Sequence, residues 1–213
     1  MNSSLEIIVH KEDIPENILA SLGDEVAVDT ETLGLNLNRD RLCLVQLKGK
    51  NSNKVHLVQF ASSKYDSPNL IKLFNNDNIL KLYHYARFDI AVILKFLGAL
   101  SVNNYCTKIA SIIARTYSNK HGLKEICQEL LGITLSKAQQ SSYWGEQALS
   151  EEQKLYAASD VLYLSSLKEK LNAMLEKEKR LTLAQSCFSF IATRSLLDVL
   201  GWNEIDVFAH SIS

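Results

Sequence analysis

Short runs of Val, Leu and Ile dominate the first part of the chain, and later apolar residues recur every three or four positions. A run of about four to eight β-branched or apolar residues between polar segments is typical of a buried strand. We therefore predict strands over residues 5–9, 25–30, 41–47, 55–60 and 79–84. Asp13 and Glu16 have the spacing of a capping box, which predicts a short helix between the first two strands. Another short helix is expected from Pro68.

Beyond residue 86 the apolar positions follow the period of an α-helix. The stripes that define these helices contain Phe88, Val92 and Phe96, then Ile109, Ile112 and Ile113, then Leu123, Ile126, Cys127, Leu130 and Leu131. Gly122 marks the break between the second and the third stripe. Strands followed by helices predict an α/β sandwich.

Two longer helices are expected in the last third of the chain. Ser150 and Gln153 form a second capping-box pair, which opens the first of them. That helix carries Tyr156, Asp160, Leu164 and Leu167. The second is expected over about residues 181–200, with Gly201 as its stop.

The size and composition of the chain suit one compact domain. It has 213 residues, of which 46% are hydrophobic, and no Gly/Ser-rich, low-complexity or repeated segment divides it. We expect a single domain over residues 1–213, with residues 202–213 as a C-terminal tail. No apolar run approaches the ~20 residues that cross a membrane, and the N-terminus lacks the pattern of a signal peptide. A cytoplasmic protein without a membrane segment is expected.

The charge of the chain bears on the kind of partner it can hold. The formal net charge is −1, with 23 Lys and Arg against 24 Asp and Glu. A protein that grips a long nucleic acid through many phosphates needs a dense basic surface, which this balance does not provide. A short substrate stays compatible with it, because bound divalent cations would add positive charge that a residue count omits.

Two carboxylates follow the apolar run Val26 to Val28 at alternating positions. Because side chains alternate along a strand, Asp29 and Glu31 lie on one face. Two acids this close repel each other unless a cation lies between them, and hard divalent cations prefer oxygen ligands. Taken alone, an Asp-x-Glu pair is more often the polar start of a turn, here before Gly34.

Two further segments carry acids. Tyr156 and Asp160 are one helical turn apart and share a helix face, although such a pair is commonly only a hydrogen-bonded surface pair. Asp89 begins an apolar helix after the predicted strand over residues 79–84, where an Asp is often only a cap or a partner of the helix dipole. Each segment alone is ambiguous.

The three segments, in this order and with this spacing, resemble the DEDDy 3′–5′ exonucleases of the RNase D-like group. Further matching stretches are Gly122-Leu-Lys-Glu, Lys137-Ala-Gln-Gln140, Trp144, and the run from Leu149 into Tyr156-Ala-Ala. The resemblance implies a DnaQ-like, RNase H-like exonuclease fold with three layers, in which a mixed central sheet is flanked by helices. One departure is Tyr143, which stands where RNase D usually has Asp.

Within that group the sequence is similar to the compact alphaproteobacterial enzymes called nano-RNase C. The likeness rests on Asp29-Thr-Glu-Thr-Leu-Gly-Leu35, Cys106-Thr-Lys-Ile-Ala110 and the segment from Gly201 to Ser211. It implies an oligomeric, ring-like assembly and a preference for very short RNA, especially dinucleotides. The chain also ends where RNase D continues into helical nucleic-acid-binding domains, so no HRDC domain is expected.

The resemblance implies a role for each chemical group in the three segments. Asp29, Glu31 and Asp160 hold one divalent cation, Mg²⁺ or Mn²⁺, and Asp29 with Asp89 holds a second. Tyr156 aligns the attacking water, and hydrolysis of the terminal phosphodiester releases nucleoside 5′-monophosphates. Because the reference pKa of tyrosine is about 10, Tyr156 is expected to act as a neutral hydrogen-bonding group and to be a weak general base.

Contacts with the substrate are expected from residues around these acids. Leu33 is expected to wedge between the last two bases. Thr30, His84 and Phe88 are expected to line the same entrance, although core packing is an equal explanation for Phe88.

Further contacts with phosphates or bases are expected from polar and basic residues beyond the acids. The candidates are Gln140, Trp144, Lys108, Arg115 and Lys137. Gln140 and Trp144 rank first because the family resemblance includes them, whereas a solvated charged face explains most lysines equally well.

Two other functions fit the same residues. The first is an RNase D-like trimming exonuclease that acts on longer RNA or on DNA. The second is an inactive RNA-binding module that keeps the fold, which the presence of all four acids and the tyrosine disfavours. The apolar tail residues Trp202, Ile205, Val207 and Phe208 either dock on the protein's own surface or form a subunit interface, and the likeness to nano-RNase C favours the interface.

Overall fold

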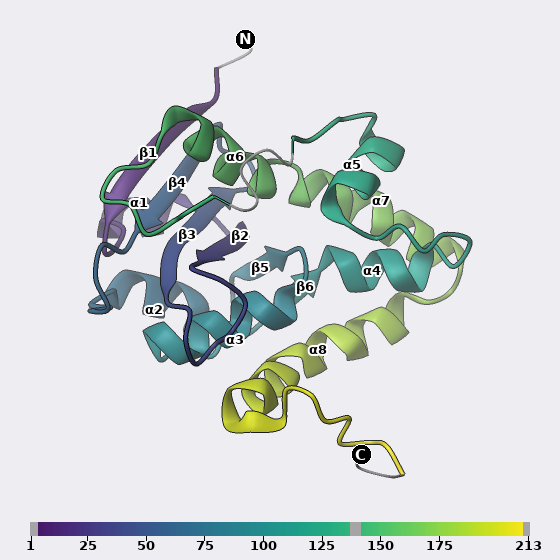
Figure 1. Ribbon diagram of the computed structural model, residues 1–213. Coiled ribbons are helices and arrows are strands. Elements are labelled where there is room, and N and C mark those ends of the chain that lie inside the picture. The colour runs from purple at the N-terminus through teal and green to yellow at the C-terminus, as the bar shows by residue number, and fades with distance from the viewer. Residues whose placement is uncertain (1–3, 137–141, 211–213) are drawn as a thin grey trace.

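The computed structural model describes residues 4–136 and 142–210. Within them, a six-stranded mixed sheet has the order β1-β4-β3-β2-β5-β6 (Figure 1). Neighbours β2–β3 and β3–β4 pair antiparallel, whereas β1–β4, β2–β5 and β5–β6 pair parallel. The strands are β1 (Glu6–Lys11), β2 (Glu25–Thr32), β3 (Leu42–Gly49), β4 (Lys54–Gln59), β5 (Leu80–Tyr83) and β6 (Asn104–Cys106).

Helices account for most of the remaining chain. They are α1 (Glu16–Ser21), α2 (Pro68–Asn75), α3 (Ala86–Leu97), α4 (Thr107–Ala114), α5 (Leu123–Leu131), α6 (Glu151–Leu162), α7 (Leu164–Lys177) and α8 (Leu181–Leu197), which continues into the π-helical segment η1 (Asp198–Trp202). Leu42 to Leu47 in β3 are all buried. A strand covered on both faces carries apolar residues continuously, which explains the unbroken apolar runs of the sequence.

The sheet lies between two helical layers. Helix α6 packs against β1 to β4, and α3 packs against β2, β5 and β6. These helices cover opposite faces of the sheet. Thr30 and Glu31 are neighbours in β2 and so point to opposite faces; Thr30 bonds to Asp89 of α3, whereas Glu31 lies close to Asp160 of α6. The predicted three-layer α/β fold with a mixed central sheet is confirmed.

The short helix expected between the first two strands is present as α1, but its expected cap is wrong and one strand was missed. Asp13 does not cap α1, which begins after Pro15 without a side-chain cap. Its carboxylate instead accepts hydrogen bonds from the backbone N–H groups of Asn69 and Leu70, at 2.8 and 3.0 Å. Asp13 therefore caps α2, a tertiary contact that spacing along the sequence does not reveal. Strand β6 was also missed, because its three residues are too few to show a pattern.

The helix that opens at Ser150 is shorter than expected. Its capping box is confirmed, since the side chains of Ser150 and Gln153 each accept a hydrogen bond from the other residue's backbone N–H. The helix ends at Tyr163, whose φ of −111° and ψ of 0° are not helical. Leu164 and Leu167 therefore belong to a separate helix, α7. Gly201 lies within η1 and has a positive φ of 101°, so it ends the last helix near the expected position.

No helix formed by the described residues has the length and hydropathy needed to span a membrane.

Candidate active site

The C-terminal end of β2 carries the first two acids. Asp29 and Glu31 follow four buried residues and point to the same face of the sheet. The antiparallel register places Gln46 of β3 directly opposite Asp29. The Gln46 side chain is fully buried, and its Nε2 donates a hydrogen bond of 3.2 Å to Asp29 Oδ2. Gln46 therefore orients a carboxylate of the candidate site.

Gln46 was not singled out from the sequence. The only available signal was its polar side chain within the apolar run of β3, and the register that turns this signal into a contact is set by the folded sheet.

Helix α6 brings a third acid to the same point. Single carboxylate oxygens of Asp29, Glu31 and Asp160 all lie within 4.8 Å of one another. A hard divalent cation contacts carboxylate oxygens at about 2.0–2.6 Å, so one ion between these oxygens can reach all three. These three residues could hold a divalent cation.

Asp89 lies beside this group at the start of α3. It is only 3% exposed and accepts a hydrogen bond of 2.7 Å from Thr30 Oγ1. It lines the same cleft as the other acids, but it is not one of the three residues whose oxygens meet within 4.8 Å. The structure thus brings Asp89 next to the cluster, on the side that α3 covers.

The acids raise one another's pKa values. Burial, followed by the charges of Asp89, Asp160 and Glu31, raises the pKa of Asp29 well above its usual range. Burial and the charges of Asp160 and Asp89 raise the pKa of Glu31 to about 9. Burial raises the pKa values of Asp89 and Asp160 to about 7. Without a cation, the folded protein retains protons here that exposed carboxyl groups release.

In the part of the chain that the structure describes, the side-chain donors to these acids are neutral groups. Gln46 donates to Asp29, Thr30 donates to Asp89, and the Tyr156 hydroxyl bonds to Asp160. A hydrogen bond from a neutral group orients a carboxylate without neutralising its charge. The cluster therefore keeps its capacity to bind a cation.

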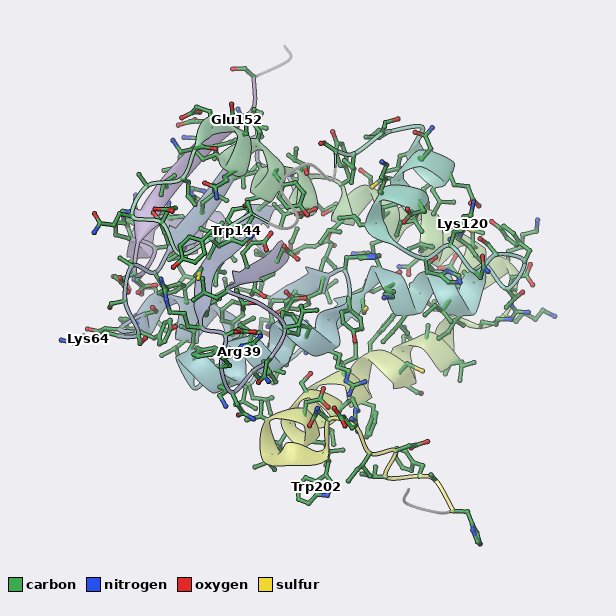
Figure 2. The ribbon with its side chains drawn as sticks, viewed as in Figure 1. Arg39, Lys64, Lys120, Trp144, Glu152 and Trp202 are labelled. Carbon is green, nitrogen blue, oxygen red and sulfur yellow. The ribbon has the colours of Figure 1, made fainter. Side chains whose placement is uncertain are left out.

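Tyr156 lies one turn before Asp160 on α6. Burial and the neighbouring carboxylates raise the pKa of Tyr156 above its ordinary value, so its hydroxyl keeps its proton at neutral pH. The ring centroids of Tyr156 and Trp144 are 6.0 Å apart. Trp144 is 2% exposed and lies in the segment before α6 (Figure 2). The Trp144 indole thus packs against the Tyr156 ring and supports its position.

A cleft of about 650 Å³ opens over the acids. The expected substrate residues Thr30, Leu33, His84, Phe88 and Trp144 all line it. Leu33 is 39% exposed, whereas Phe88 is half-buried and both lines the cleft and packs against the core.

Other cleft residues were missed by sequence reasoning. Leu35 is 82% exposed and Tyr85 is 46% exposed. Tyr85 has a positive φ of 72° at the start of α3, a conformation that is costly for a residue with a side chain. Its place within the His84-to-Asp89 stretch was the one signal that pointed to it.

The basic residues that were expected to contact phosphates or bases lie in different environments. Lys108 lies over the Tyr85 ring, with its Nζ 4.3 Å from the centroid. The expectation that Arg115 contacts phosphate is wrong, because its guanidinium is fully buried and paired with Glu129. Lys137 and Gln140 lie outside the described residues.

Comparisons with known proteins agree with this geometry. The family described as 3′–5′ exonuclease matches residues 7–176. Ribonuclease D of Acidiphilium cryptum is 33% identical over 169 residues, which cover 76% of this chain and 42% of that protein. Ribonuclease D of Bartonella henselae is 32% identical over 181 residues, covering 84% and 44%. The chain spans less than half the length of these curated relatives.

Solved structures match over nearly the whole chain. Brucella melitensis NrnC bound to pGG is 47% identical with a TM-score of 0.92, covering 98% of this chain and 100% of that one. Brucella melitensis NrnC with bound Mg²⁺ is 47% identical with a TM-score of 0.90, covering 97% and 100%. Escherichia coli RNase D supports the fold. It is 24% identical with a TM-score of 0.73, covering 91% of this chain and 51% of that one. The expected resemblance to the RNase D-like group and to nano-RNase C is confirmed.

The raised pKa values predict how a divalent cation changes stability with pH. Glu31, Asp89 and Asp160 have higher pKa values in the folded state, about 9 for Glu31 and about 7 for the two aspartates, than the value of about 4 in the unfolded chain. The cation-free protein therefore loses stability as the pH rises from the unfolded pKa values through the folded ones. A bound cation replaces the protons. We therefore expect Mg²⁺ to raise the melting temperature more at about pH 8 than at about pH 6, measured by circular dichroism.

The matched control for this experiment is Glu31→Gln, which removes one charge at nearly constant size. It should reduce the effect of Mg²⁺ at the higher pH. An equal increase in melting temperature at both pH values would contradict the prediction.

Proposed function

Since this chain belongs to the 3′–5′ exonuclease family, we propose that it is a metal-dependent 3′–5′ exoribonuclease. It hydrolyses short RNA, above all dinucleotides, to nucleoside 5′-monophosphates. The observation that carries this proposal is the meeting of Asp29, Glu31 and Asp160 from two separate elements, with Asp89 and Tyr156 lining the same cleft.

The acids are assigned to two divalent cations, Mg²⁺ or Mn²⁺. Asp29, Glu31 and Asp160 hold one, and Asp29 with Asp89 holds the other. When bound, such cations supply positive charge that activates water and stabilises the departing 3′ oxygen. The donor set fits this role, because it consists of carboxylates that hard cations prefer, and a magnesium-bound structure of Brucella melitensis NrnC supports the choice of metal.

Tyr156 is assigned to the attacking water. Its hydroxyl bonds to Asp160, and it keeps its proton because burial and the neighbouring acids raise its pKa. A protonated hydroxyl can hold a water by hydrogen bonding, with its oxygen in line with the scissile phosphodiester. Trp144, which contacts the tyrosine ring, limits the orientations that this hydroxyl can take.

The cleft suits a short substrate. Its volume of about 650 Å³ lies within the range of pockets that enclose small ligands, about 300–1,000 Å³. The net charge of −1 does not favour contact with many phosphates. Leu33 lines the cleft, where it can separate the last two bases, and the relative bound to pGG supports a dinucleotide.

The alternative is a trimming exonuclease that acts on longer RNA or on DNA. One feature favours it: a neighbouring hollow shares Leu35, Tyr85 and Phe88 with the cleft and is also lined by Arg39 and Arg87. A longer strand could continue from the cleft into this hollow. The two proposals differ in how turnover depends on the length of the substrate.

Substrate length therefore provides the first test. We expect kcat/KM for an RNA dinucleotide to exceed that for an RNA of about ten nucleotides, because contacts end near the second nucleotide. Release of nucleoside 5′-monophosphates in Mg²⁺ measures both rates. Equal or faster hydrolysis of the longer RNA would support the alternative, and full activity in excess chelator would refute a metal-dependent reaction.

The role of Tyr156 gives a second prediction. Tyr156→Phe keeps the ring packed on Trp144 but removes the hydroxyl, so we expect kcat to fall roughly 100-fold while Mg²⁺ still raises the melting temperature. Asp29→Asn is the contrasting variant and should lose both activity and the effect of Mg²⁺. Unchanged kcat in Tyr156→Phe would show that the hydroxyl does not position the water.

We also propose that the chain forms a homo-oligomer through its C-terminal region. Arg194 holds the tail by donating to the carbonyls of Trp202 and Asn203, and its guanidinium pairs with Asp198. The tail thus docks on its own helix, yet Trp202 projects from this end of the molecule, away from Trp144 (Figure 2). Large apolar side chains are exposed here, namely Phe190, Leu196, Leu200, Trp202, Val207 and Phe208.

So many exposed apolar side chains in one region are typical of an interaction surface. We expect Leu200→Lys to reduce the molar mass measured by light scattering, because a buried lysine disfavours association. Leu155→Lys, on α6 and similarly exposed, is the matched control and should leave the molar mass unchanged. A monomeric wild-type protein would contradict the proposal.

We further propose that the chain is a single exonuclease domain that acts in the cytoplasm. The family match over residues 7–176 and the alignment of NrnC over nearly the whole chain support one domain. Bacterial ribonuclease D relatives support a protein that acts within the cell.

A further inference from the structure

Two linked hydrogen bonds fix the orientation of His84. Its Nδ1 lies 2.9 Å from the hydroxyl oxygen of Thr107, and the same oxygen lies 3.1 Å from the backbone carbonyl of Tyr83. Thr107 begins α4 and is fully buried. His84 itself lines the cleft that contains the acids.

The direction of these bonds follows from the number of protons. A threonine hydroxyl has one proton to donate, and a carbonyl can only accept. The Thr107 proton is therefore used in the bond to Tyr83, so the bond between Thr107 and His84 must be donated by Nδ1–H. Turning the hydroxyl toward His84 would give up the bond to the Tyr83 carbonyl in a fully buried position, which is unfavourable.

The tautomer determines what His84 presents to the cleft. With the proton on Nδ1, a neutral imidazole has an unprotonated Nε2, which is a hydrogen-bond acceptor. Burial and the charge of Lys108 lower the pKa of His84 to about 3, despite the opposing charge of Glu125. The ring is therefore neutral, and an anionic phosphate gains no hydrogen bond from Nε2.

We propose that Nε2 of His84 accepts a hydrogen bond from a ribose hydroxyl of the 3′-terminal nucleotide, which makes His84 a specificity-determining residue. This inference rests on the proposed function and adds the group that the residue recognises. A hydroxyl of the terminal ribose is the donor that every 3′ end carries, whichever base it has. The N–H donors of the bases differ in position from base to base, so one fixed acceptor cannot meet them all.

The 2′ and 3′ hydroxyls share this chemistry, and three substrates separate them. These are an RNA dinucleotide, the same molecule lacking the terminal 2′ hydroxyl, and the same molecule lacking the terminal 3′ hydroxyl. We expect one of the two deoxy substrates to lose about two- to tenfold in kcat/KM with the wild-type protein, the effect of one neutral hydrogen bond. If neither deoxy form is hydrolysed more slowly, the proposal is wrong.

Variants show whether His84 causes the loss. In His84→Phe the discrimination should disappear, and in His84→Gln, which retains an acceptor, part of it should return. Thr107→Val removes the acceptor for Nδ1–H and should reduce the discrimination, whereas Thr107→Ser keeps the hydroxyl and should preserve it. Discrimination that persists at the wild-type level in His84→Phe would overturn the proposal.

A measurement without substrate separates this inference from the proposed function. The ¹⁵N NMR shifts of His84 distinguish a protonated ring nitrogen from an unprotonated one. We expect Nδ1 protonated and Nε2 unprotonated near neutral pH in wild type and in Thr107→Ser, and a change in Thr107→Val. A protonated Nε2 would refute the assignment even in an active enzyme, while absent dinucleotide hydrolysis with the expected tautomer would point to failure of the proposed function.

Discussion

Mutual repulsion among closely spaced, largely enclosed carboxylates is the constraint on which the candidate site depends. Asp29, Glu31 and Asp160 meet within 4.8 Å, and Asp89 lies beside them. Their raised pKa values reflect the unfavourable free energy of holding several negative charges close together where little water solvates them. Protons can relieve the repulsion, and so can divalent cations, which also supply the charge that phosphodiester hydrolysis needs.

The surrounding fold holds the acids together against this repulsion. The sheet places Asp29 and Glu31 at the end of β2, and helices on its two faces bring Asp160 and Asp89 to that end. Among the described residues, the side chains that donate hydrogen bonds to the acids are neutral, as Gln46 illustrates at Asp29. An arginine or lysine in that position would pair with the carboxylate and compete with a metal ion. His84, which also lines the cleft, is likewise a neutral group, because its pKa is lowered.

Much of this arrangement could be predicted from the sequence, because it depends on local patterns. Alternation placed Asp29 and Glu31 on one face of a strand, and helical spacing placed Tyr156 and Asp160 on one face of a helix. Contacts set by the tertiary fold could not be predicted in this way. Gln46 faces Asp29 only through strand register, and Arg115 proved to be buried against Glu129 rather than directed at a phosphate.

Locating a metal ion tests the central claim most directly. Anomalous diffraction from crystals soaked in Mn²⁺ would show where the ion binds. The account predicts Mn²⁺ within about 2.0–2.6 Å of carboxylate oxygens of Asp29, Glu31 and Asp160. Mn²⁺ bound only elsewhere, or none at this cluster, would contradict it.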